Sequence, residues 1–221
     1  MKLRLVSLVS ITLMVLAGGA AAGTLSFGIK AGLNLSSITE TPEAWNDDKS
    51  FKPGLAAGAV MVYEFDNGFG IQPELLYSQK GVSTSLYEGF VDVGMDLNLA
   101  YLELPVLARY TFPLNGSFKP NVFAGPSIAY SLSSELDFEA GILSAGVDFS
   151  SMTHVSDFGI VVGAGFGWEV GDGVLTFDGR YTRGFTNVIL TGDFEINGDT
   201  QAIEGDDFKN HGMAFMLGYL F

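Results

Sequence analysis

The final segment of the chain, residues 211–221, most constrains the possible fold. Alternate positions hold the large apolar residues Met213, Phe215, Leu217, Tyr219 and Phe221. The positions between them include the tiny residues Gly212, Ala214 and Gly218. Successive residues of a β-strand lie on opposite faces, and the outer face of a half-buried strand is usually polar. A large apolar face opposite a face of tiny residues instead fits a narrow barrel whose outside meets lipid.

The aromatic residue at the end of this strand also indicates how the protein is assembled. A last strand that ends in an aromatic residue resembles the signal by which bacterial outer-membrane barrels are recognised for assembly. We therefore expect Tyr219 and Phe221 to form an assembly signal, with the barrel-assembly machinery and outer-membrane lipids as partners.

The first 22 residues have the order of a secretory signal peptide. Lys2 and Arg4 precede an apolar run from Leu5 to Leu16, and a small-residue cleavage site follows at residues 20–22. The apolar run is too short for a membrane-spanning helix. We predict a signal peptide over residues 1–22 and an outer-membrane β-barrel domain over residues 23–221, with a retained N-terminal anchor as the alternative. The chain has no cysteine, so it offers no lipidation site or disulfide framework.

The composition narrows the class of protein further. Glycine is frequent (29 residues), aromatic residues make up 13% and charged residues only 16%, below the usual quarter. The formal net charge is −14, and it becomes −16 without Lys2 and Arg4, since residues 1–22 contain no acid. Such acidity argues against nucleic acid as a partner, which requires a basic surface.

Seven further segments show the same alternation. With the last segment, the eight predicted strands are residues 24–35, 51–65, 71–80, 97–112, 119–132, 158–170, 175–185 and 211–221. Aromatic residues cluster near both ends of the apolar faces, as in the two girdles of a membrane barrel. We predict an all-β fold, a monomeric eight-stranded antiparallel up-and-down transmembrane β-barrel in the outer membrane of a Gram-negative-type bacterium. The alternative is a soluble β-sandwich that packs the same aromatic residues in its core.

The connections alternate between short and long. Turn-forming residues fill the short connections at residues 66–68, 113–117 and 171–173, whereas those near 36–50, 81–96, 133–157 and 186–210 are long and polar. This alternation is the outer-membrane pattern, with the long loops outside the cell. Strand alternation continues over residues 132–138 and 188–196, and Asn197-Gly198 is a hairpin turn signal. We therefore expect the third and fourth connections to be partly β-hairpins.

The long connections hold 18 of the 25 acids: Glu40, Glu43, Asp47, Asp48, Glu88, Asp92, Asp96, Glu135, Asp137, Glu139, Asp148, Asp157, Asp193, Glu195, Asp199, Glu204, Asp206 and Asp207. Acidic loops can attract divalent cations or a cationic partner, or can simply keep the surface solvated. No loop has the ligand spacing of an EF-hand.

Charged residues also have the parity of the barrel interior: Lys30, Glu64, Glu74, Lys80, Glu103, Arg109, Glu169, Asp178 and Arg180. Charges in a narrow interior must be paired or hydrated. We expect an internal ion-pair ladder with Lys30, Glu74, Glu103, Arg109, Asp178 and Arg180 as candidates. Its middle is predicted to hold Glu103, Asp178 and Arg180. The alternative is the selectivity filter of a small pore, but the interior of eight strands is just wide enough for side chains to fill.

Three sequence motifs resemble the PorT-like outer-membrane β-barrel proteins. They are Gly28-Ile-Lys-Ala-Gly-Leu-Asn34, Gly70-Ile-Gln-Pro-Glu-Leu-Leu-Tyr-Ser-Gln-Lys-Gly81 and Tyr101-Leu-Glu-Leu-Pro-Val-Leu-Ala-Arg-Tyr-Thr-Phe112. The resemblance implies an eight-stranded barrel of the same general kind as the OmpX- and OmpA-type proteins. It implies little chemistry, because most members of that family have no assigned activity.

Catalysis at the outer rim would need a base, usually a histidine. The chain has two histidines, His154 among serines of the third connection and His211 at the start of the last strand. Neither lies in a motif with catalytic or metal-binding spacing, so we predict no catalytic residue, no metal site and no cofactor. The expected function is a structural or surface-interaction role with an unknown surface ligand. The alternatives are a narrow pore for small solutes or ions and a lipid-modifying enzyme at the outer rim.

Overall fold

A computed structural model describes residues 23–39, 50–88, 91–140, 143–148, 156–186, 192–196, 199–203 and 209–221. Side chains are described for residues 23–37, 51–81, 98–133, 157–186 and 209–221. The predicted signal peptide lies outside these ranges. Within them, no helix is long and apolar enough to span a membrane.

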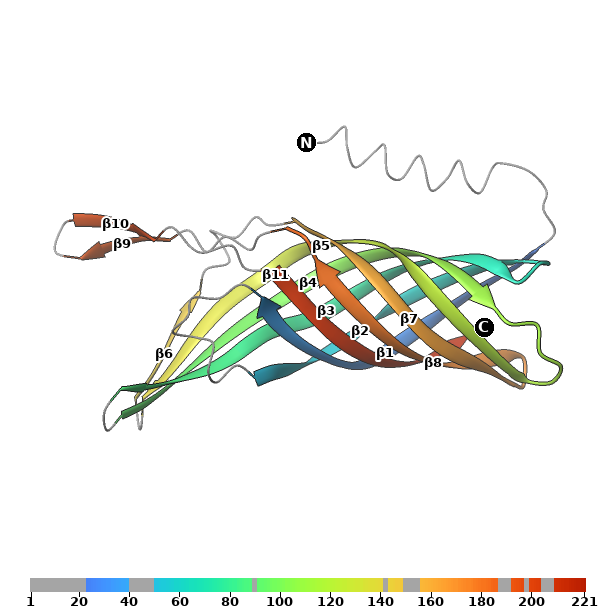
Figure 1. Ribbon diagram of the computed structural model, residues 1–221, viewed down its shortest axis with the longest axis horizontal. Coiled ribbons are helices and arrows are strands. Elements are labelled where there is room, and N and C mark those ends of the chain that lie inside the picture. The colour runs from blue at the N-terminus through green and yellow to red at the C-terminus, as the bar shows by residue number, and fades with distance from the viewer. Residues whose placement is uncertain are drawn as a thin grey trace, which may run out of the picture.

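Eight long strands close into one barrel: β1 (Gly23–Thr39), β2 (Ser50–Phe65), β3 (Phe69–Glu88), β4 (Val91–Thr111), β5 (Phe118–Ala140), β7 (Ser156–Val170), β8 (Gly173–Gly184) and β11 (Lys209–Leu220). Each pairs antiparallel with its neighbours in the chain, and β11 closes the circle on β1. The strands wind obliquely around one axis (Figure 1). The prediction of a closed, eight-stranded, all-β barrel is confirmed.

The two faces of the strands have the predicted polarity. Large apolar side chains are exposed on the outside, including Leu104 (41% exposed) in β4 and Leu217 (59%) in β11. The alternate residues are buried inside, and they include the charged residues Lys30, Glu74 and Arg180. This polarity is the reverse of a soluble protein, and a lipid environment explains it because apolar side chains on the outside then meet apolar solvent.

Short turns join the strands at one end of the barrel, called here the turn end. Gly68, Gly116 and Gly171 have φ values of 81°, 99° and 63°, which only glycine adopts readily. Aromatic rings surround this end, with ring centroids 4.9 Å apart for Phe69 and Tyr110 and 5.2 Å apart for Tyr110 and Phe112. The predicted turns and the aromatic rim at this end are therefore present. By the topology of outer-membrane barrels, the turn end is periplasmic and the opposite end, called the loop end, is extracellular.

The strands run further toward the loop end than the sequence suggested. The second connection was predicted to be a long loop over residues 81–96, but β3 continues to Glu88 and β4 begins at Val91. The prediction is wrong because the two strands stay paired from Gly81↔Asn98 to Glu88↔Val91, and acidic residues occupy positions of a regular ladder.

The expected hairpins in the third and fourth connections are confirmed at the level of the backbone. β5 continues to Ala140 and pairs with β6 (Leu143–Asp148). In the fourth connection, β9 (Gly192–Ile196) pairs with β10 (Asp199–Ile203), with Ile196 opposite Asp199. Figure 1 shows β6 and the β9–β10 hairpin at the end opposite the short turns.

Candidate functional site

A buried ion-pair cluster crosses the barrel interior. Lys30 from β1 contacts Glu74 of β3 at 2.9 Å, and it also pairs with Asp178 of β8. Arg180 of β8 donates to both oxygens of Glu74, at 2.6 and 3.1 Å, and to Asp178 at 3.0 Å. The four side chains are at most 4% exposed. With two cations and two carboxylates, this central cluster is neutral as a group.

Small neighbours explain why the central cluster fits inside so narrow a barrel. Lys30 pairs in register with Gly58 of β2 and Gly218 of β11, so no side chain flanks it on either adjoining strand. A Cβ on Gly165 of β7 would lie 2.6 Å from an Asp178 carboxylate oxygen. The tiny residues of the inner face therefore make room for the charged side chains.

A chain of polar side chains extends the central cluster around the wall. Gln72 donates to Glu74 at 2.6 Å and accepts from Arg109 at 2.8 Å. The next link is the Thr111 hydroxyl, which lies 3.4 Å from Arg109 Nε and donates to Glu64 at 2.5 Å. Arg109, an ion-pair candidate from the sequence, thus takes part through hydrogen bonds to neutral groups.

A second polar layer lies nearer the loop end. Lys80 pairs with Glu103 at 2.5 Å and lies 5.4 Å from the centre of the Tyr101 ring. Glu103 was expected to lie with Asp178 and Arg180 in the middle of the interior. That expectation is wrong, because Glu103 forms its ion pair with Lys80 in this second layer. Asn210 of β11 contacts the Tyr101 hydroxyl at 3.3 Å and Asp157 at 3.4 Å.

Two other acids differ from their predicted positions. Asp157 was assigned to the third connection, but it lies in β7 and is 4% exposed. Asp157 lies inside the barrel because β7 already starts at Ser156. The serines around this position have the composition of a loop, so the sequence did not indicate this early start. Glu169 was assigned to the interior, but it is exposed beside Lys119 at 3.8 Å, because β7 ends one residue later at the turn end.

The polar layers and apolar residues together fill the interior. Leu107, Phe123 and Val161 form a buried cluster, and the Arg180 guanidinium lies 5.2 Å from the centre of the Phe123 ring. Ala56, Leu76, Ala214 and Met216 form another. Buried charges are tolerated when they are paired and hydrogen-bonded. Within the described residues, paired charges and apolar side chains therefore occupy the barrel interior.

The remaining predicted site residues are near the ends of the barrel. Tyr219 is exposed on the outward face of β11. Phe221, the residue after β11, is also exposed, and it exchanges backbone hydrogen bonds with Phe27 of β1 at 2.8 and 3.3 Å. His211 meets the Phe51 ring edge-on, with centroids 6.0 Å apart. His154 lies outside the described residues. Among the residues that are described, no three His, Cys, Asp or Glu side chains are grouped to hold a metal ion.

A sheet continues from the barrel wall at the loop end. In this extension, β4 pairs with β3 and β5, and β6 pairs with β5. The register pairs Asp96 with Asp137, and Glu135 with Asp148. Positions two apart on a strand share a face. One face of the extension therefore holds Asp96, Glu135, Asp137, Glu139 and Asp148, whereas the alternate positions hold Leu97, Leu136, Phe138 and Val147.

The acidic face of this extension is continuous with the outward face of the barrel. In β4, Leu104 and Leu102 are exposed on that outward face, and Asn98 and Asp96 follow at the same parity. The outward face thus changes from apolar to acidic within a few residues. A polar outward face is expected where a membrane-spanning strand leaves the lipid, because the apolar band of a barrel is limited to the membrane.

A closed barrel with an apolar outside and a charged, filled inside defines an outer-membrane β-barrel protein. The chain belongs to the family of outer membrane proteins with a β-barrel domain, whose model matches residues 17–190. The protein is accordingly located in the outer membrane of a Gram-negative-type bacterium, as predicted. No curated protein matches the chain.

Three solved structures have similarity to the chain. Neisserial surface protein A is 11% identical, with a TM-score of 0.44, and the match covers 89% of this chain and 97% of that one. The attachment invasion locus protein Ail of Yersinia pestis, in complex with the heparin analogue sucrose octasulfate, is 15% identical (TM-score 0.42; 90% and 99% covered). The N-terminal β-barrel domain of Pseudomonas aeruginosa OprF is 13% identical (TM-score 0.35; 90% and 100% covered).

Proposed function

We propose that the protein is a non-catalytic surface-interaction protein that acts through the acidic sheet extension at its loop end. The observation that supports this most strongly is the paired sheet of β3, β4, β5 and β6 beyond the barrel. Within the described residues β6 pairs with β5 alone, so its other edge offers unpaired backbone groups. An exposed strand edge can bind a partner by adding a strand.

The charge of the extension selects the class of partner. Its acids share one face, and like charges gathered on one surface create a field that attracts cations. The proposed partner is therefore a cationic protein segment that pairs with the edge of β6 and meets the acidic face. Binding through such a field weakens as salt screens it.

The competing function is a narrow pore, and the central cluster argues against it. Lys30, Glu74, Asp178 and Arg180 come from three strands and meet across the interior, where each is almost fully buried. An ion would have to break these pairs to pass. We expect no single-channel conductance from the refolded barrel in planar bilayers, and steady conductance would favour the pore.

The experiment on the surface role compares two triple variants. Asp96, Asp137 and Glu139 in the extension are changed to Asn, Asn and Gln in one variant, which removes three charges from the proposed face. A matched control makes the same changes at three exposed acids of the turn end, Asp66, Asp172 and Glu169. Barrels in nanodiscs are then tested for binding of an oligolysine peptide over a series of salt concentrations.

We expect the extension variant to lose most of the salt-dependent binding and the control to keep it. Equal binding by the two variants would show that the acids of the extension only keep the surface solvated. Both variants must migrate as folded barrels in unheated gel electrophoresis, so that a folding defect is recognised.

We also propose that the chain is a PorT-like member of the barrel family and a monomer. The three motifs that carry this resemblance supply the polar interior: Lys30 comes from the first, Gln72, Glu74 and Lys80 from the second, and Tyr101, Glu103 and Arg109 from the third. A shared interior explains why these residue types occur together.

Tyr219 and Phe221 are the proposed contact with the barrel-assembly machinery, and their exposure at the C-terminal end of the barrel wall supports this.

A further inference from the structure

The outward face of β3, β4 and β5 has a polar row between the apolar wall and the acidic sheet extension. Residues directly opposite each other on paired strands share a face. The polar row consists of Gln79, Ala100 and Ser133. The row on its turn-end side consists of Tyr77, Leu102 and Tyr130, and the row on its loop-end side includes Asn98 and Glu135. The polar row is therefore the first row beyond the apolar wall, and none of its three residues is charged.

A β-bulge turns Ser133 onto this outward face. The register of β4 and β5 shifts between Ala100 and Tyr101, which leaves Leu132 as an extra residue of β5. Strict alternation from Tyr130 would turn Ser133 inward, but the bulge places Ser133 opposite Ala100. Bulges are frequent next to functional sites, because they change the direction of a side chain.

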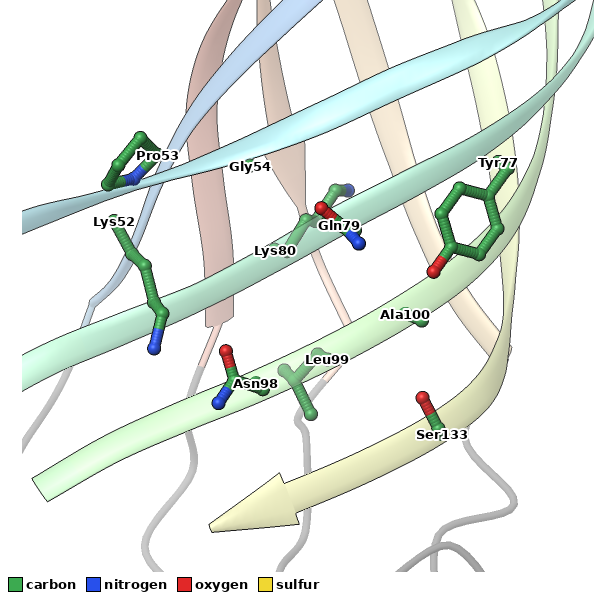
Figure 2. A pocket seen from close by; sticks show the side chains of 10 residues that line it. All are labelled: Lys52, Pro53, Gly54, Tyr77, Gln79, Lys80, Asn98, Leu99, Ala100 and Ser133. Carbon is green, nitrogen blue, oxygen red and sulfur yellow. The ribbon is translucent and has the colours of Figure 1, made fainter. Parts of the chain in front are cut away.

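A pocket of about 310 Å³ lies beside the polar row and is lined by residues of β2, β3, β4 and β5 (Figure 2). It includes residues 52–54 of β2, within the stretch where the register of β2 and β3 shifts. Ala100 is small, so the polar row is hollow in the middle. The Tyr77 hydroxyl, the Gln79 amide nitrogen and the Ser133 hydroxyl approach Ala100 from different sides (Figure 2).

These three polar groups are neutral and available for hydrogen bonds. The Gln79 side-chain oxygen accepts from the Leu55 N–H at 3.2 Å, which leaves the amide nitrogen to donate into the pocket. The Tyr77 and Ser133 hydroxyls can each donate and accept. Within the part of the chain whose side chains are described, no hydrogen bond joins these two hydroxyls or this nitrogen to another residue.

Charges of both signs border the pocket. Lys52 and Lys80 contribute to its lining. Lys80 is paired with Glu103, and Lys52 also takes part in an interaction of its own. On the loop-end side, Glu135 follows Ser133 at the same parity. An ionic ligand of either sign would therefore meet a like charge, which is unfavourable. The pocket favours a polar ligand without net charge.

The level of the pocket on the barrel wall indicates where its ligand is found. Tyr77 and Tyr130, in the row on the turn-end side, are 42% and 47% exposed. Tyrosine rings favour the boundary between hydrocarbon and head groups. Leu102 and Leu104 continue the outward face of β4 into the apolar wall. The pocket therefore lies at the level of the lipid head groups in the outer leaflet.

From this arrangement we propose that the pocket binds the sugar of a neutral outer-leaflet glycolipid. A sugar ring has hydroxyl groups around its edge, and the amide and the two hydroxyls of the pocket can hydrogen-bond to several of them at once. The faces of a sugar ring are C–H groups, which can lie against the exposed Tyr77 ring. The acyl chains of the glycolipid lie against the apolar wall at Leu102 and Leu104.

Native mass spectrometry of the refolded barrel in detergent micelles tests the site with three lipids that have the same acyl chains: monoglucosyl diacylglycerol, diacylglycerol and phosphatidic acid. The double variant Tyr77→Phe/Ser133→Ala removes two hydroxyls, and Ala100→Leu fills the hollow. The matched controls are Tyr181→Phe, at an exposed tyrosine of β8, and Ala108→Leu, at an exposed residue of β4 outside the pocket. Unheated gel electrophoresis verifies that each variant is folded.

We expect the wild type to bind the glucosyl lipid in preference to the other two lipids. Each pocket variant should bind the glucosyl lipid about tenfold more weakly, whereas the two controls should keep wild-type affinity. If Ala100→Leu does not fold, the double variant decides the question, because it only removes two oxygen atoms.

Three outcomes would overturn the proposal. Unchanged binding by the folded pocket variants, or equal binding of the glucosyl lipid and diacylglycerol, would show that the pocket does not contact the sugar. Equal or stronger binding of phosphatidic acid would show that the pocket does not favour a neutral ligand. Methyl glucoside that displaces the glucosyl lipid at equal concentration would show that the site serves a soluble sugar rather than a lipid.

Discussion

Replacing Arg180 by Met tests whether the interior of the barrel is sealed. The guanidinium forms three hydrogen bonds, two to Glu74 and one to Asp178, and its side chain is 4% exposed. In the variant, Lys30 alone would have to neutralise both carboxylates. Removing one partner of a buried ion pair costs about 3–5 kcal/mol, because the other charge stays buried. We expect the free energy of unfolding to fall by this amount.

The measurement is urea unfolding of the barrel in phospholipid vesicles, followed by tryptophan fluorescence. Arg183→Met is the matched control, because Arg183 is exposed and lies on the outward face of the same strand. It should change the free energy of unfolding by less than about 1 kcal/mol. Adding Glu74→Gln to Arg180→Met should restore part of the loss, with a coupling of about 0.5–3 kcal/mol. If Arg180→Met unfolds like the wild type, water screens these charges and a sealed interior is refuted.

Three further predictions concern the wall, the last residue and the interior packing. Leu104→Arg should lower the free energy of unfolding in vesicles by about 2–4 kcal/mol if Leu104 faces the middle of the membrane, and an unchanged value would contradict this position. Deletion of Phe221 should reduce the fraction of protein inserted in the outer membrane without reducing export, as cell fractionation would measure, and normal insertion would show that Phe221 is dispensable. Gly163→Ala should lower the free energy of unfolding by about 1–3 kcal/mol, because its Cβ would lie 2.5 Å from the Phe123 ring. Gly179→Ala, whose Cβ would lie 3.7 Å from its nearest neighbour, is the control and should cost much less.

Which side chains face into the barrel and which face out could be predicted from the sequence, because successive side chains of a strand point to opposite faces. Once Leu104 is assigned to the outside, Glu103 and Arg109 must lie inside, and both are 7% exposed. The ends of the strands were harder to predict. Beyond the lipid, the outward positions become acidic at Asp96, and acidic residues in a strand have the composition of a loop. Asp157 was missed because serines surround the early start of β7.

The partners inside the barrel could not be predicted from parity. Lys30 and Asp178 are 148 residues apart, and the central cluster joins side chains from β1, β3 and β8. Which inward residues share a level depends on the stagger of strands around the whole barrel. The sequence of a single strand does not reveal this stagger. Glu103 was therefore predicted to lie in the middle of the interior, whereas it lies in the polar layer nearer the loop end.

The pairing of β1 with β11 has a consequence for the order of events during assembly. Lys30 enters with the first strand, but one of its two carboxylate partners, Asp178, lies 148 residues later in β8. Until β11 docks, the strands would form an open sheet. Lys30, Arg180 and their carboxylate partners would then lie on a face of that sheet that is exposed to water. Closure therefore brings together backbone pairing and charge neutralisation in one late step. A chain that stops short of β11 would lack the backbone pairing of β11 with β1 and β8, which holds Asp178 beside Lys30. Contacts between such distant segments form slowly. The pairs that join β8 to β1 and β3, Lys30 with Asp178 and Arg180 with Glu74, are therefore completed only when the barrel closes.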